Sequence, residues 1–195
     1  MGLEVDFNFS NNSKLQIGSV LISEPFLDDD YFTRSVILLC EHNKEGSFGF
    51  VLNKYVDSEV GDIFPEFTDH DIKISVGGPV DHSNLFYIHT LGNVIDKSIL
   101  IKDEIYLGGD FEQIKELIKN DPNKVKQFKF FIGYSGWGEQ QLENELKEKS
   151  WLVINNVSTE TIIDTSIENI WEDILNKLGG RFKLMSKFPI NPSDN

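Results

Sequence analysis

The residues whose types most suggest catalysis or ligand binding lie at positions 133–138, where three glycines surround a serine and two aromatic residues. They are Gly133, Tyr134, Ser135, Gly136, Trp137 and Gly138. Because an apolar run precedes them and a helical pattern follows, they stand where a hydrolase nucleophile elbow or a phosphate-binding loop would lie. Their spacing fits neither motif. The nucleophile elbow has the pattern Gly-x-Ser-x-Gly, but Trp137 stands where its second glycine should be. The phosphate-binding loop has the pattern Gly-x-Gly-x-x-Gly, whereas the glycines here follow the reverse order. We interpret the glycines as turn residues, with Tyr134 and Trp137 anchoring the chain on the core.

Cys40 and His42 form a second candidate site. They alternate along a predicted strand, which would place a thiol and an imidazole on one face as a possible nucleophile and base. The sequence shows no third group at a characteristic spacing that would orient the imidazole. A cysteine that ends a Val-Ile-Leu-Leu run is typical of a buried apolar position. The other histidines, His70, His82 and His89, lack the short ligand spacings of a metal site. We therefore assign no metal and no cofactor.

Three consecutive carboxylates, Asp28, Asp29 and Asp30, resemble a cation ligand set. A calcium loop that begins at Asp28 needs a glycine where Thr33 stands and a bidentate glutamate where Leu39 stands. The spacing therefore predicts an acidic turn that caps residues 30–34 instead of a cation site.

Short runs rich in β-branched and aromatic residues predict the strands that must position these groups. The predicted strands are residues 19–23, 35–40, 48–52, 72–76, 85–89, 104–107, 128–133 and 151–155. The polar loop at residues 41–46 is short and ends in glycine, so it predicts an antiparallel hairpin of the second and third strands.

Three other stretches carry the helical period. The first begins at the N-cap Asp110, and the second covers residues 139–147. The third follows a capping box at residues 165–168 and ends at the glycines 179–180. Consecutive strands mixed with few helices predict an α+β fold instead of strict βαβ alternation.

Length and composition predict one domain, residues 15–190, between polar tails at residues 1–14 and 191–195. The single cysteine excludes an intramolecular disulfide and fits a reducing compartment. The longest apolar run, residues 36–40, is far below the ~18 residues of a membrane span. The first residues also lack a basic segment followed by an apolar one. We therefore expect a cytoplasmic protein with no membrane segment.

The charge balance argues against direct DNA binding. The chain of 195 residues has 18 Lys and Arg against 32 Asp and Glu, a net charge of −14 that repels a polyanion. Arginine, the preferred residue for phosphate and base contacts, occurs only at Arg34 and Arg181. Lysine-rich residues 115–129 and 177–187 are interpreted as solvated faces, with docking of an anionic partner as the alternative.

Several of these segments, in this order, resemble the YqgE/AlgH family of bacterial proteins over about residues 18–189. The matching pieces are Gly-Ser-Val-Leu-Ile-Ser-Glu-Pro at 18–25, Asp-Tyr-Phe-Thr-Arg-Ser at 30–35, Leu-Cys-Glu-His at 39–42, Gly-Phe-Val-Leu-Asn at 49–53, Gly-Gly-Pro-Val at 77–80, and residues 133–138 with Gln-Leu-Glu at 141–143. The resemblance implies an α+β fold whose bifurcated, mainly antiparallel sheet includes a small closed barrel and is flanked by helices. It implies no established activity, although members are often labelled transcriptional regulators.

The matched polar residues and the glycine segment form the predicted binding surface. They are Arg34, Glu41, His42, Asn53 and the six residues Gly133 to Gly138. The leading hypothesis is a cytoplasmic protein that acts through contact with another protein, with at most an indirect effect on transcription and no enzyme activity. The alternative is a small-molecule binder or hydrolytic enzyme with a pocket near Cys40, His42 and residues 133–138. A third hypothesis is direct DNA binding through residues 177–187, and the oligomeric state stays open.

Overall fold

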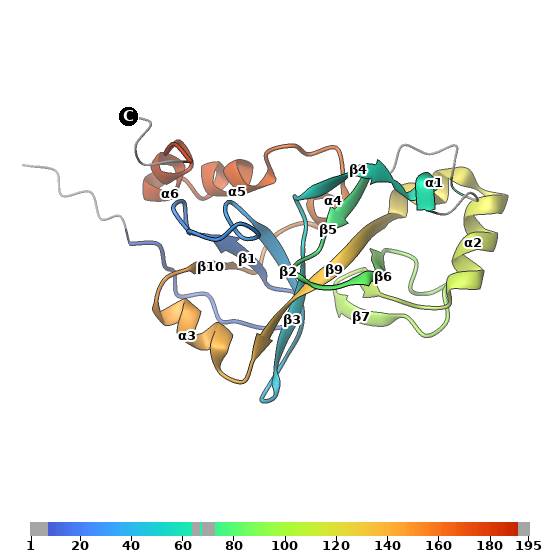
Figure 1. Ribbon diagram of the computed structural model, residues 1–195, viewed down its shortest axis with the longest axis horizontal. Coiled ribbons are helices and arrows are strands. Elements are labelled where there is room, and N and C mark those ends of the chain that lie inside the picture. Colours follow the sequence, from blue (N-terminus) through green and yellow to red (C-terminus); the bar gives the residue numbers. More distant parts are fainter. Residues whose placement is uncertain (1–7, 64–66, 68–72, 191–195) are drawn as a thin grey trace, which may run out of the picture.

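The protein is an α+β structure in which a large sheet is flanked by helices (Figure 1). The computed structural model describes residues 8–63, 67 and 73–190. The described strands are β1 (Val20–Ser23), β2 (Val36–Asn43), β3 (Gly46–Val51), β4 (Tyr55–Glu59), β5 (Lys73–Val76), β6 (Val80–His89), β7 (Ile99–Lys102), β8 (Ile105–Leu107), β9 (Phe128–Gly138) and β10 (Trp151–Ile154). The described helices are α1 (Val60–Ile63), α2 (Phe111–Asn120), the 3-10 helix η2 (Pro122–Gln127), α3 (Gln141–Lys147), α4 (Thr159–Ile163), α5 (Ile170–Leu178) and α6 (Gly180–Met185).

The sheet forks along β9, as the resemblance implied. The main path has the order β10-β1-β2-β3-β9-β6-β8-β7, and β5 links β9 to β4. Residues 130–132 of β9 pair with β6 on one edge and with β5 on the other, whereas residues 135–138 pair with β3. Every described strand pair is antiparallel except β5 with β9, which is parallel. One strand therefore carries both branches.

The expected closed barrel is wrong, because the sheet stays open. In the part of the chain that the structure describes, no backbone ladder joins β7 to β10, the two ends of the path. The Nζ atom of Lys102, the last residue of β7, instead donates to the carbonyls of Asn155 and Val157 beyond β10, the latter at 3.2 Å. The chain turns back at Asp103, whose φ is 48°, and pairs β7 with β8 instead. A side chain bridges the gap that a ladder would have closed.

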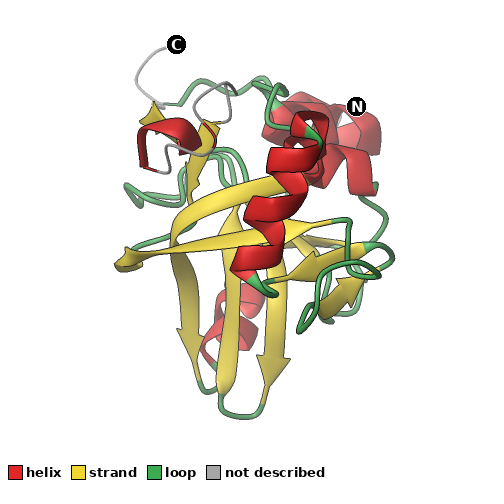
Figure 2. Cartoon of the chain, turned by 90° about the vertical axis from the view of Figure 1, so that its right-hand side faces the viewer, coloured by secondary structure: helices red, strands yellow, loops and turns green. Residues whose placement is uncertain are grey.

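The core of the described residues consists of three apolar clusters. Helices lie on both faces of the sheet (Figure 2), and each cluster includes residues of different helices. Helices α4, α5 and α6 cover the first, α5 through Trp171, while α2 covers the second with Ile114 and Ile118. Helix α3 covers the third through Leu142. Because side chains of a strand alternate between faces, residues 36–40 of β2 supply both the first and the third cluster. This two-sided burial explains their continuous apolar run.

The sequence predicts the first helix better than the third. Asp110 caps α2 as expected, since its carboxylate accepts from the backbone N–H groups of Glu112 and Gln113 at 3.1 and 3.3 Å. The predicted capping box at residues 165–168 is wrong, because α5 begins only at Ile170. The N–H and hydroxyl of Ser166 donate to the Asp164 carboxylate instead, at 2.7 and 2.6 Å. A turn around Asp164 thus replaces the first helical turn.

The strand predictions locate most of the sheet but omit β4 and β7. Strand β4 ends in three polar residues, which interrupt the apolar pattern, whereas β7 is as short and nearly as apolar as the predicted β1. The polar turn at Asp29 is confirmed, because its carboxylate accepts from the N–H groups of Tyr31 and Phe32 at 2.8 and 3.0 Å. Ile72, expected to begin the fourth strand, lies outside the described residues.

The predicted tails lie partly outside the described part of the chain, which omits residues 1–7 and 191–195. Residues 8–14 have no helix or strand, yet Phe9 is only 4% exposed and lies 6.0 Å from the ring of Phe182. The Asn11 side chain also donates to the Val153 carbonyl at 2.7 Å. This stretch therefore packs on the domain.

The predicted turn at residues 133–138 is wrong, because these residues complete β9. Residues 135–138 pair with Gly46 to Gly49 of β3 and Tyr134 pairs with Val80 of β6, which fixes the segment as a strand despite the three glycines. Gly133 lies at the fork with a φ of 72°, and a Cβ atom there would lie 2.6 Å from the Gly78 carbonyl oxygen and 2.8 Å from that of Val80. Glycine is required at this position for both reasons.

Gly133→Ala is expected to lower the free energy of unfolding by about 2–4 kcal/mol, since it combines a strained φ with backbone overlap. Urea denaturation measures this change. The matched control is Gly138→Ala in the same strand, where the nearest atom to the added Cβ is Gln141 Oε1 at 3.9 Å. The control is expected to change the free energy of unfolding by less than about 1 kcal/mol. Equal losses in both variants would contradict a special role of the fork.

Candidate functional site

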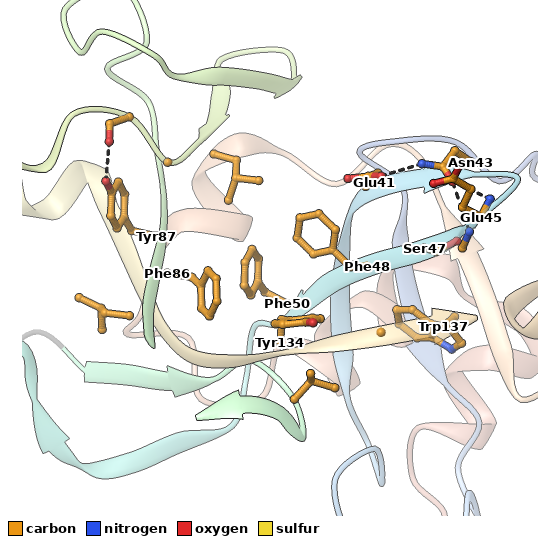
Figure 3. Close-up of a pocket in the computed structure, with 17 residues that line it drawn as sticks. Glu41, Asn43, Glu45, Ser47, Phe48, Phe50, Phe86, Tyr87, Tyr134 and Trp137 are labelled. Carbon is orange, nitrogen blue, oxygen red and sulfur yellow. Dashed lines mark hydrogen bonds between the residues drawn. The ribbon is translucent and has the colours of Figure 1, made fainter. Parts of the chain in front are cut away.

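A groove of about 840 Å³ lies between the β2–β3 hairpin and β6 (Figure 3). Its described lining residues are Glu41, Asn43, Glu45, Gly46, Ser47, Phe48, Phe50, Val80, Leu85, Phe86, Tyr87, Leu107, Gly108, Gly109, Tyr134, Gly136 and Trp137. The two branches of the sheet create it, because β3 and β6 pair with different parts of β9 and diverge. The C-terminal half of β9 supplies Tyr134, Gly136 and Trp137 between them.

Four aromatic rings form the apolar wall of the groove. Phe48 and Phe50 come from alternate positions of β3, Phe86 from β6 and Tyr134 from β9 (Figure 3). Successive ring centroids around this set lie 5.8, 5.6, 5.8 and 5.9 Å apart, mostly edge to face. Phe50 is fully buried and stacks on Phe131, whereas the other three rings are half-buried. The three partly open rings offer aromatic surface to a ligand.

One end of the groove is acidic. Glu41 and Glu45 are exposed there, and Asn43 lies between them. The Asn43 side chain donates to Glu41 Oε1 at 2.6 Å and accepts from the N–H groups of Glu45 and Gly46 at 2.8 and 3.2 Å. It therefore fixes the two-residue hairpin turn and orients the Glu41 carboxylate. None of the described lining residues is a lysine, arginine or histidine.

The opposite end of the groove is a glycine turn held by a buried histidine. The Nε2 atom of His89 donates to the Gly108 carbonyl at 2.7 Å, and Nδ1 accepts from the N–H of Leu91 at 3.0 Å. Burial lowers the pKa of His89, so the imidazole stays neutral and keeps this tautomer. The Tyr87 hydroxyl donates to the Gly109 carbonyl at 2.8 Å. These bonds set the position of the turn, and His89 itself does not line the groove.

The proposed pairing of Cys40 with His42 is not formed, because a β-bulge separates their faces. The register with β3 passes from Leu39↔Gly49 to Glu41↔Phe48, which leaves Cys40 as an extra residue. Cys40 lies in the core cluster that contains Phe50, and Glu41 faces the groove. His42 instead points to the α3 side, with Nδ1 2.8 Å from the Ser47 hydroxyl and Nε2 3.9 Å from Glu143.

Cys40 has the environment of a structural thiol. It is 4% exposed, and its Sγ atom lies 3.7 Å from the Leu38 carbonyl oxygen. Burial among apolar side chains raises its pKa far above the usual range, which disfavours the nucleophilic thiolate. Ser135 is fully buried, and its hydroxyl donates to the Gly77 carbonyl at 2.9 Å. Neither side chain lines the groove.

Arg34 and Asn53 lie together but away from the groove. The Asn53 side chain donates to the Arg34 carbonyl at 2.9 Å and accepts from the N–H of Val36 at 2.9 Å, so it ties two chain segments together. The Arg34 guanidinium donates to the Phe188 carbonyl and lies 4.9 Å from the centroid of the Trp171 ring. Both residues hold local structure, Arg34 at a φ of 51°.

The structure thus divides the predicted binding residues. Glu41, Tyr134, Gly136 and Trp137 line the groove, whereas Arg34, His42, Asn53, Ser135, Gly133 and Gly138 do not. Sequence reasoning missed Phe48, Phe86 and Leu107, since aromatic and aliphatic residues in short strands are ordinarily assigned to the core. The available signal was the aromatic pair at positions 48 and 50, which places two large rings on one strand face.

Lys129 is a second group that the sequence did not single out. The expectation that residues 115–129 form a solvated face is wrong here, because Lys129 is 1% exposed. Its Nζ atom donates to the Asp164 carbonyl at 3.2 Å and to the Tyr55 hydroxyl at 3.4 Å. Burial lowers its pKa to about 7, and the Asp164 carboxylate opposes that shift. Lys129 thereby links β9 to β4 and α4.

No group of three His, Cys, Asp or Glu side chains within residues 8–63, 67 and 73–190 is placed to hold a metal ion. Over the same ranges, none of the helices has the length and apolar character that crossing a membrane requires.

Comparison with known proteins places this architecture. A family model described as AlgH-like matches residues 20–183. A UPF0301 protein of Parabacteroides distasonis is 45% identical over 189 residues, which cover 95% of this chain and 95% of the relative. A UPF0301 protein of Cytophaga hutchinsonii is 42% identical over 179 residues, or 91% of this chain and 98% of that relative.

Two solved structures share the fold. The crystal structure of protein DIP2367 from Corynebacterium diphtheriae has a TM-score of 0.78 at 23% identity and covers 96% of this chain and 100% of that one. The solution structure of the AlgH protein from Pseudomonas aeruginosa has a TM-score of 0.68 at 23% identity, with 91% and 97% covered. The molecule thus shares the α+β fold of these two structures. With a family model over most of its length and close relatives, the chain belongs to the AlgH-like family, also called UPF0301.

Cys40 is expected to react with dithionitrobenzoate at least about 100-fold more slowly in the native protein than in guanidinium chloride, because it is buried and protonated. Thionitrobenzoate absorbance measures both rates. His42→Gln is expected to leave the native rate unchanged, since His42 lies on the other side of β2. A tenfold slower reaction in this variant would show a coupled thiol and imidazole and contradict the structure.

Lys129→Met is expected to raise the free energy of unfolding by about 1–2 kcal/mol at neutral pH, because the cost of burying the amine exceeds the loss of its long hydrogen bonds to the Asp164 carbonyl and the Tyr55 hydroxyl. Above pH 7 the native amine loses its proton, whereas the unfolded chain keeps it up to a pKa of about 10.4. Wild-type stability should therefore rise between pH 7 and 9 relative to the variant, so that the gain shrinks. Urea denaturation across this range is the measurement, with the exposed Lys126→Met as control. A difference independent of pH would contradict the lowered pKa.

Proposed function

We propose that this AlgH-like protein acts by contact with a partner protein, a segment of which it holds in the groove between β3 and β6. The observation that carries the proposal is the aromatic wall of the groove, where the half-buried rings of Phe48, Phe86 and Tyr134 line a cavity of about 840 Å³. Partly exposed aromatic side chains in a concave site are typical of residues that anchor a binding partner. The proposal includes a cytoplasmic location and an effect on transcription that is at most indirect.

The positions of the nucleophilic side chains favour binding over hydrolysis. Cys40 and Ser135 are buried behind the groove, and His42 lies on the opposite face of β2. A hydrolase needs its nucleophile and base within hydrogen-bond reach of one another at the substrate. The alternative of an enzyme pocket near Cys40, His42 and residues 133–138 therefore has no geometric support.

The C-terminal basic segment offers little support for DNA binding. Lys177 lies in the last turn of α5, while Arg181 and Lys183 belong to α6. The Arg181 guanidinium donates to the Ser10 carbonyl at 2.9 Å and lies 5.0 Å from the Phe182 ring centroid. A side chain held in this way is less free to neutralise a phosphate. The net charge of −14 also opposes approach to a polyanion.

The proposal is tested with a variant that fills the groove. Gly136 lines it, and a Cβ atom there lies 3.4 Å from the Tyr134 ring, so Gly136→Val places an apolar side chain in the cavity. Gly138→Val is the matched control, because Gly138 is an exposed glycine of the same strand that does not line the groove. Both variants should remain folded, which circular dichroism checks.

Peptides selected from a displayed library of random nonapeptides on the wild-type protein are the probe. We expect them to bind with dissociation constants in the micromolar range, to shift amide NMR signals of β3 and β6, and to bind Gly136→Val at least about tenfold more weakly. Gly138→Val should bind like the wild type. Selected peptides that bind Gly136→Val equally well, or that shift signals elsewhere, would place the binding surface outside the groove and overturn the proposal.

A further inference from the structure

The charge of the groove is one-sided. Its described lining contains two carboxylates, Glu41 and Glu45, and no cationic side chain. Both glutamates are exposed, so each carboxylate is accessible to a ligand. A net charge of −14 over the whole chain adds a long-range field of the same sign. A cationic group is therefore the ligand charge that this end of the groove favours.

The aromatic wall favours the same charge. The faces of the half-buried rings of Phe48, Phe86 and Tyr134 carry the negative end of the ring quadrupole. A guanidinium or ammonium group within about 6 Å of such a ring is attracted to it. The carboxylates and the ring faces come from different strands, yet both attract a cationic group.

The bulge at Cys40 brings the two features together. It turns Glu41 to the groove and makes it the direct cross-strand partner of Phe48. The Cβ atoms of direct partners in an antiparallel pair lie about 4.5–5.5 Å apart. One ligand side chain can therefore contact the Glu41 carboxylate and the Phe48 ring at the same time. Asn43 holds the carboxylate in this place through its 2.6 Å hydrogen bond.

Resting on the proposed function, we infer that the groove selects a partner segment in which an arginine stands next to an apolar anchor residue. The guanidinium contacts Glu41 and the face of Phe48, while the anchor packs on Phe86 and Tyr134. Arginine fits better than lysine, because its planar group stacks on a ring and bonds a carboxylate with two N–H donors. Glu45, at the tip of the hairpin, adds attraction at the rim.

The test uses two synthetic hexapeptides, acetyl-Gly-Ser-Trp-Arg-Ser-Gly-amide and the same peptide with neutral citrulline in place of arginine. Calorimetry and amide NMR titration measure binding to the wild type, to Glu41→Gln and to Glu116→Gln. The last variant removes the same charge from an exposed position on α2 that does not line the groove. Glutamine at position 41 can still accept from Asn43, so the hairpin should keep its shape.

The arginine peptide is expected to bind the wild type about tenfold more tightly than the citrulline peptide, with signal shifts in β3 and β6. Glu41→Gln should weaken the arginine peptide about threefold and leave the citrulline peptide unchanged, the size expected of an exposed ion pair. Glu116→Gln should change neither. Raising the salt concentration should weaken only the arginine peptide.

Two results would overturn the inference and keep the proposed function. Equal binding of both peptides, lost in Gly136→Val, would show an apolar groove without charge selection. Equal binding of free N-acetylarginine amide would show a site for a small cation that needs no neighbouring anchor. Signal shifts outside the groove for both peptides, with Gly136→Val indistinguishable from the wild type, would overturn the proposed function as well.

Discussion

Backbone pairing of β9 with β3, β5 and β6 is the constraint on which the rest of the molecule depends. A strand has two edges, so β9 can pair with three strands only if two of them pair with different residues along the same edge. Gly133 makes this possible, since its φ of 72° and its missing side chain let β9 change direction where the Gly78 and Val80 carbonyls approach. The two branches then diverge, and the groove is the space between them.

The bulge at Cys40 decides the chemistry of that groove. In a regular strand, Cys40 and His42 would share one face and Glu41 the other. The extra residue reverses the face that each side chain takes from Glu41 onward. The Cys40 thiol therefore stays in the core, the Glu41 carboxylate faces the aromatic wall and the His42 imidazole faces α3. One irregular residue therefore separates the groups that looked catalytic and joins groups suited to binding a cation.

Side chains close several gaps that backbone pairing leaves open. Lys102 bridges the two ends of the sheet, Lys129 connects β9 to β4 and α4, and His89 holds the glycine turn at one end of the groove. All three donate to backbone carbonyls, which need a partner when they are removed from water. The protein thus keeps an open sheet without buried unpaired carbonyls at these points, and the groove retains fixed ends.

The sequence by itself determined the local elements and the family. Asp110 predicts the start of α2, and the apolar run at residues 36–40 predicts a strand that is buried on both faces. The motifs, taken in order, predict the AlgH-like family and its forked α+β sheet. These features depend on short-range hydrogen bonds and periodicity, which neighbouring residues fix. Only the tertiary structure decided that residues 133–138 form a strand, that the barrel stays open and that Glu41 meets Phe48. Each of these depends on the register of segments distant in the chain, and a one-residue change of register reverses which face a side chain takes.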